Sequence, residues 1–120
     1  MEAFNRINLG PTNYNPNTVT KLYSVDSTKT GKLIFDFNVV NITTLEDLPE
    51  KTITVSIKIL DKDDNIINYI IPGQILSPKV SINNPQKIIL KPGDKVMVEA
   101  SAVGACFYAS VVSGILINNN

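Results

Sequence analysis

Hydrophobic and polar residues alternate along much of the chain, most clearly over residues 52–59. The apolar residues there occupy every second position: Ile53, Val55, Ile57 and Ile59. A period of two places successive side chains on opposite faces of an extended strand. One face of this strand is therefore apolar and the other polar, which is typical of an antiparallel sheet with one face on a core.

Similar alternation, interrupted by turns, recurs along the chain and predicts about eight strands. Segment 75–82 contains Pro78, so we expect it at the edge of a sheet. The strand lengths and turn spacing indicate an all-β fold, an antiparallel β-sandwich of the jelly-roll or immunoglobulin-like type. Besides residues 52–59, the predicted core contains Leu33, Phe35, Phe37, Val96 and Val98. The predicted strands cover residues 20–25, 32–42, 52–60, 66–71, 75–82, 87–90, 95–103 and 105–117.

The N-terminal residues break this alternation. Residues 1–19 are rich in Asn, Pro and Gly and are predicted to form an extended arm. The sandwich domain then spans residues 20–117, and residues 118–120 form a polar tail. The arm is either a loose terminus or a segment that packs on a neighbouring subunit. In the second case its apolar side chains are candidate assembly contacts: Phe4, Ile7, Leu9 and Tyr14.

The last predicted strand, residues 105–117, is apolar on both faces. A single sandwich core covers one face of a strand. The other face is therefore expected to be covered by the arm or by a neighbouring chain. The candidate assembly contacts on this second face are Tyr108, Val112 and Leu116, next to Cys106.

The composition excludes several functions. The length of 120 residues corresponds to one domain. The 11 basic residues are balanced by 11 acidic residues and form no basic cluster in the sequence that would indicate nucleic-acid binding. No apolar run approaches the roughly 20 residues of a membrane span, and the N-terminus has no apolar segment typical of a secretion signal. Histidine is absent and Cys106 is the single cysteine, so the commonest general base and an internal disulfide are both missing. We expect no enzyme activity, no membrane or nucleic-acid partner, and synthesis in a cytoplasm.

Residues 61–65, Asp-Lys-Asp-Asp-Asn, have the ligand spacing of half a calcium-binding loop. Asp61, Asp63 and Asn65 match its first three ligand positions. The sixth and twelfth positions are Ile66 and Pro72, where such a loop has Gly and Glu. We therefore expect a solvated hairpin turn and no metal or other cofactor.

Four segments resemble small all-β structural proteins of tailed-bacteriophage virions. They are Lys-Leu-Tyr-Ser-Val at 21–25, the strand at 32–42, Leu-Lys-Pro-Gly-Asp-Lys-Val-Met-Val-Glu-Ala-Ser-Ala at 90–102, and Val-Ser-Gly-Ile at 112–115. The third segment contains a Pro-Gly-Asp turn in which Gly93 is predicted to adopt a positive φ. The resemblance covers residues 20–117 and has no catalytic residues to transfer.

This resemblance implies a non-enzymatic structural protein that packs as a multimer in the virion. Its partners would be copies of itself and other virion proteins, in a head-decoration, neck, collar or tail position. The alternative function is a carbohydrate- or receptor-binding β-sandwich. Sites of that kind use exposed aromatic side chains, especially Trp, and this chain has no Trp.

Overall fold

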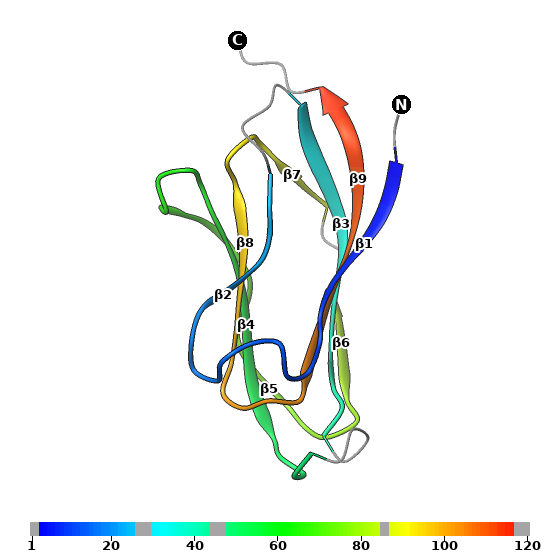
Figure 1. Cartoon of the computed structure of the whole chain (residues 1–120), viewed down its shortest axis with the longest axis vertical. Helices are drawn as coiled ribbons and strands as arrows, with labels where there is room; N and C mark the ends of the chain where they lie inside the picture. Colours follow the sequence, from blue (N-terminus) through cyan, green and yellow to red (C-terminus); the bar gives the residue numbers. More distant parts are fainter. Residues whose placement is uncertain (1–2, 26–29, 44–47, 85–86, 117–120) are drawn as a thin grey trace.

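The computed structural model describes residues 3–25, 30–43, 48–84 and 87–116, and side chains within 6–25, 36–43, 48–84 and 87–111. The polar tail predicted at 118–120 lies outside these ranges. The described residues form nine strands and no helix, which confirms the all-β prediction (Figure 1). None of them therefore forms a helical membrane span. The strands are β1 (Ala3–Leu9), β2 (Thr20–Ser24), β3 (Thr30–Asn41), β4 (Ile53–Leu60), β5 (Ile66–Leu76), β6 (Ser81–Asn84), β7 (Ile88–Leu90), β8 (Lys95–Ala100) and β9 (Ala105–Leu116).

The strands form two antiparallel sheets that face each other. One sheet has the order β1-β9-β3-β6, with β7 also beside β3, and the other has the order β2-β8-β4-β5. Strands from the two halves of the chain are thus paired: β1 with β9, β2 with β8, β3 with β6 and β7, and β4 with β5. The chain is one long hairpin whose tip is the turn at 61–65, and successive pairs fall in alternate sheets. This wrapped hairpin is a jelly roll, and it excludes the immunoglobulin-like alternative.

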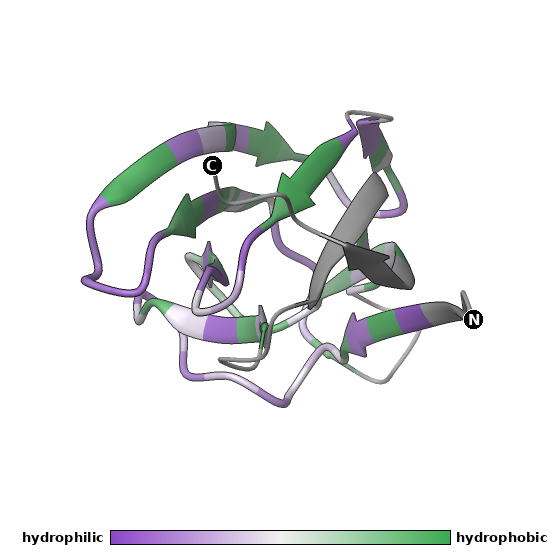
Figure 2. Ribbon diagram, turned by 90° about the horizontal axis from the view of Figure 1, so that it is seen from above, coloured by the Kyte–Doolittle hydropathy of each residue, from purple (hydrophilic) through white to green (hydrophobic). Residues whose placement is uncertain are grey.

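The alternating residues of β4 contribute every second side chain to the core. Ile53, Val55 and Ile57 are fully buried, while the residues between them are partly or fully exposed. Ile57 lies opposite Val98 of β8 and Ile71 of β5, so the centre of this sheet is apolar on its inner face. Figure 2 shows the resulting alternation of hydrophobic and hydrophilic positions along the strands. The predicted core residues Phe37, Val96 and Val98 are also buried, whereas the side chains of Leu33 and Phe35 lie outside the described part.

The N-terminal segment differs from the predicted arm. Residues 3–9 form β1, which pairs with β9 from Ala3 opposite Ser113 to Leu9 opposite Phe107. Without β1, the backbone groups on this side of β9 would have no strand partner. The residues that suggested an arm lie in the connection 10–19, after β1 has ended.

β5 is longer than the sequence predicted, because Pro72-Gly73 does not end it. Gly73 has a φ of +78°, and the pairing register with β4 shifts between Val55 and Ile57. Both features indicate a β-bulge. A proline is tolerated there because β5 is an edge strand. The predicted strand 75–82 is therefore wrong: its first residues end β5, and β6 begins only at Ser81.

A buried polar cluster joins the two sheets at one end of the sandwich. The Asn41 Nδ2 atom donates hydrogen bonds to the backbone oxygens of Lys51 (2.8 Å) and Leu76 (2.9 Å). Its Oδ1 atom accepts from the Thr43 hydroxyl (2.8 Å) and the Thr43 backbone N–H (3.1 Å). Since Asn41 and Thr43 are both fully buried, these bonds satisfy groups that would otherwise be costly to remove from water.

Candidate assembly surface

Tyr14, a candidate contact with a neighbour, is instead packed inside its own chain. Its side chain is 7% exposed, and its ring meets Phe107 edge to face, with centroids 5.8 Å apart. The hydroxyl donates to the Ala102 oxygen (3.1 Å) and accepts from the Ala105 N–H (2.9 Å). Burial raises the pKa of Tyr14 above its ordinary value. Tyr14 therefore fastens the connection 10–19 to the loop between β8 and β9.

The other N-terminal candidates also belong to the sandwich. Ile7 and Leu9 are half-buried and pack against the core. Phe4 lies opposite Val112 in the β1–β9 ladder, and Leu116 of β9 lies opposite Thr30 of β3. The side chains of the candidates Phe4, Val112 and Leu116 lie outside the described part, so their role in assembly stays a prediction.

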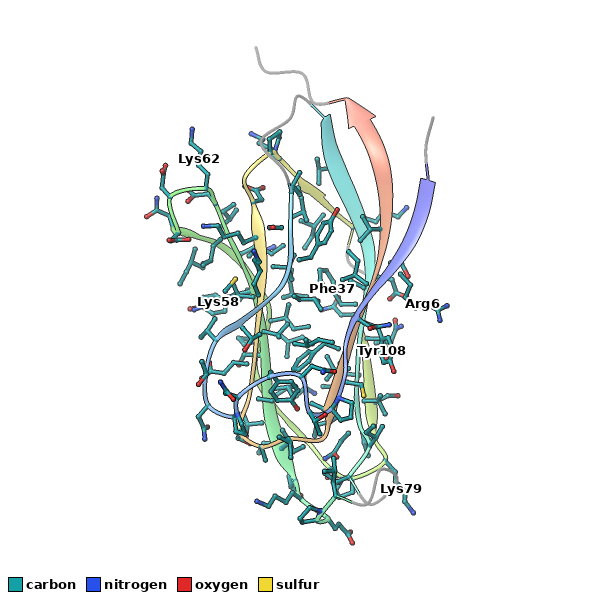
Figure 3. All side chains as sticks on the ribbon, in the orientation of Figure 1. Arg6, Phe37, Lys58, Lys62, Lys79 and Tyr108 are labelled. Atoms are coloured by element: carbon teal, nitrogen blue, oxygen red, sulfur yellow. The ribbon has the colours of Figure 1, made fainter. Side chains whose placement is uncertain are left out.

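Tyr108 lies on the outer face of its sheet. Phe107 and Ala109 on either side of it are buried, so the Tyr108 side chain points away from the core, as Figure 3 shows. The neighbouring Cys106 raises the pKa of the Tyr108 hydroxyl, and Arg6 partly offsets that shift. Cys106 itself is buried. On the described part of this outer face, the buried Cys106 is followed by the half-exposed Tyr108 and Ser110.

Among the described residues, the most exposed large apolar side chains lie mainly on β5, a strand in which no assembly contact was predicted. They are 49% to 69% exposed. Residues 66–71, Ile-Ile-Asn-Tyr-Ile-Ile, contain more apolar residues than one strand face can hold, which is the signal that could have identified them. Four of these side chains, here termed the β5 surface, are Ile66, Ile67, Tyr69 and Ile75, and Ile89 of β7 is exposed as well.

The edges of the two sheets differ in how they are protected. β1 and β2 carry the charged residues Arg6 and Lys21, and β6 and β7 have only four and three residues. β5 has 11 residues and none of them is charged. Charge and shortness are two common means of preventing edge strands from associating. β5 has neither, but Pro72 and the bulge at Gly73 interrupt its edge. What distinguishes β5 from the other edges is therefore its row of exposed, uncharged side chains.

Two side chains limit how a neighbour can approach β5. Asn84 Nδ2 donates to the Ile70 oxygen (3.1 Å), and Asn41 Nδ2 occupies the Leu76 oxygen. A neighbour is therefore expected to pack against the β5 side chains rather than extend the sheet along the whole strand.

The hairpin turn before β5 is held by the Asp61 side chain. Asp61 Oδ1 accepts from the N–H groups of Asp63 (2.8 Å) and Asn65 (2.9 Å), and the Asn65 hydrogen bond is the main cause of the lowered Asp61 pKa. Asp64 forms an ion pair with Lys95 of β8. Over the described ranges, no group of three or more His, Cys, Asp or Glu residues could hold a metal ion.

No protein-family model matches the sequence, and no curated protein matches it. A chain of the Bacillus endospore appendages, which form disulfide-linked pili, has a TM-score of 0.54 and 11% identity over 98% of this chain and 88% of that chain. A chain of infectious bursal disease virus has a TM-score of 0.51 and 12% identity over 98% of this chain and 33% of that chain. A chain from the acid-stable capsid of a Helicobacter pylori bacteriophage has a TM-score of 0.49 and 13% identity over 93% of this chain and 86% of that chain. At these identities, the likeness to the pilus chain and to the bursal disease virus chain shows a shared fold alone. This chain spans about a third of the bursal disease virus chain.

Proposed function

We propose that this chain is a non-enzymatic structural subunit that packs as a multimer through the β5 surface. The observation that carries the proposal is the long, uncharged β5 edge with its exposed apolar side chains. Such an edge is a liability in a monomer, and a neighbouring subunit would remove it from water. Burying apolar area in this way provides the free energy for association.

The structural comparisons support a role as a building block. The pilus chain is matched over nearly its full length, and the bursal disease virus chain contains the same fold within a longer polypeptide. Together with the sequence resemblance to phage structural proteins, this favours a virion component, in a decoration, neck, collar or tail position. Its partners would then be copies of itself and other virion proteins, and it would be made in the host cytoplasm.

The proposal is tested by measuring the molar mass in solution by size-exclusion chromatography with light scattering. We expect the wild-type protein to form a defined multimer. Ile67→Lys and Ile75→Lys should dissociate it, because each would place a charge in the apolar contact. Thr12→Lys is the matched control: it adds the same charge at an exposed position outside β5.

A wild-type protein that stays monomeric at high concentration would contradict the proposal. So would lysine variants that are folded and keep the wild-type molar mass. The position in a particle requires a second measurement, a particle reconstruction in which this chain is traced.

A further inference from the structure

The outer face of the β1-β9-β3-β6 sheet contains a hollow of about 280 Å³. Arg6 of β1 and Asp36 of β3 lie on opposite sides of Ser110 of β9. One row along, Tyr108 lies opposite Asn38 of β3. The hollow is lined by these five residues and Ala109. Figure 3 shows Arg6 and Tyr108 on the same side of the sheet, away from Phe37 in the core.

The two charged groups of the hollow, Arg6 and Asp36, do not form an ion pair with each other. In the described part of the chain, the one ion pair joins Lys95 and Asp64, so Arg6 and Asp36 remain separate. Asp36 Oδ1 accepts one hydrogen bond, from Asn83 Nδ2 (3.1 Å). That bond orients the carboxylate and leaves it capacity to accept others. The hollow thus presents donors on one side and acceptors on the other, with no net charge.

We propose that this hollow binds a neutral sugar ring of a glycan. Sugar hydroxyls both donate and accept, so one ring can receive hydrogen bonds from Arg6 and donate them to Asp36 and Asn38. The apolar C–H face of the ring would lie against Tyr108, whose aromatic ring provides an apolar surface with a polar tip. Asp36 would repel an anionic ligand and Arg6 a cationic one, so a ligand without net charge is favoured over either.

The size of the hollow limits the ligand. Small-molecule sites usually have volumes of roughly 300–1,000 Å³, and this hollow, at about 280 Å³, lies just below that range. It therefore suits one ring of a glycan rather than several. This binding function is independent of assembly through β5, because the hollow and the β5 surface belong to different sheets.

Saturation-transfer difference NMR tests the proposal, since it detects ligands that bind weakly. The probes are lactose, mannotriose, cellotetraose and N-acetylglucosamine, with N-acetylneuraminic acid as the anionic comparison. We expect at least one neutral probe to bind at millimolar concentration and more tightly than the anionic one. Tyr108→Ala and Asp36→Asn should each weaken that binding at least tenfold. Asp63→Asn is the matched control for Asp36→Asn, because it removes a carboxylate at an exposed position outside the hollow and should bind as the wild type does.

Three results would overturn the proposal. The first is that none of the neutral probes binds. The second is that Tyr108→Ala and Asp36→Asn, with wild-type circular dichroism, keep full affinity. The third is that these variants change the molar mass in solution and not sugar binding, in which case a second copy of the chain occupies the hollow. Loss of sugar binding with an unchanged multimer, or the reverse, separates this proposal from assembly through β5.

Discussion

Tyr14→Phe removes one oxygen atom at the point where the N-terminal connection is fastened to the sandwich. The ring can remain against Phe107, so apolar packing is kept. The Ala105 N–H, in a fully buried residue, then loses its acceptor, and the half-buried Ala102 carbonyl loses its donor. The perturbation therefore isolates the hydrogen bonds of one hydroxyl.

The expected cost follows from burial of the two partners. A buried polar group left without a partner costs roughly 1–3 kcal/mol, and the Ala105 N–H cannot reach water. The Ala102 carbonyl is partly accessible, so its share is smaller. We expect Tyr14→Phe to lower the free energy of unfolding by about 2 kcal/mol in urea denaturation. Tyr69→Phe, at an exposed tyrosine, should change it by less than about 0.5 kcal/mol.

The same residue makes stability depend on alkaline pH. Because the folded-state pKa of Tyr14 is raised above 10.0, its stabilising contribution is complete below that pH and is lost as pH rises through the folded-state pKa. The difference in unfolding free energy between wild type and Tyr14→Phe should therefore be constant up to about pH 10 and shrink above it. A stability loss below about 0.5 kcal/mol at neutral pH would refute the reasoning, since the connection would then be held by other contacts.

Four further changes test the fold. Ile57→Ala should lower the free energy of unfolding by roughly 2–5 kcal/mol in urea, since Ile57 is fully buried; a much smaller loss would mean that the β4 register is wrong. Gly104→Ala should cost roughly 2–5 kcal/mol, because φ is +122° and the new Cβ would lie 2.4 Å from Thr43 Cγ2; a melting temperature like that of wild type would contradict this turn geometry. Deletion of residues 1–17 removes β1 and Tyr14, so circular dichroism should show an unfolded or much less stable protein, and a stable truncated domain would restore the arm interpretation. Millimolar calcium should leave the melting temperature unchanged, because the turn at 61–65 lacks further ligands; a rise of several degrees would disprove this.

The strands and turns that the sequence predicted correctly are those determined by residues close together in the chain. The alternation over β4 and β8 places Ile53 and Val96 in the core, as observed. The residue types at 91–94 specify a turn in which Gly93 has a φ of +92°. The turn at 61–65 is likewise closed by the Asp61 side chain. In each case the side chain and the backbone geometry that it requires are adjacent in sequence.

Long-range pairing could not be derived in this way. Residues 3–9 are paired with β9, about a hundred residues later in the chain, and seven residues carry too little alternation to reveal it. The distinction between a jelly roll and an immunoglobulin-like sandwich also depends on which strands pair. For the assembly surface, an apolar side chain is visible in the sequence but its cover is not: Tyr14 is covered by its own chain. Only the strand order shows that β5 is an edge, and only then does its apolar character become informative.

The wrapped hairpin explains why the two proposed surfaces lie where they do. β4 and β5 are the innermost pair, and no later strand adds beyond β5, so this strand must be an edge. A contact that combines a free strand edge with the exposed side chains of that strand can form only at such a position. β9, in contrast, lies between β1 and β3, so side chains from three adjacent strands meet on its outer face. A hollow that brings Arg6, Tyr108 and Asp36 together needs a strand with a neighbour on each side, and β9 is such a strand.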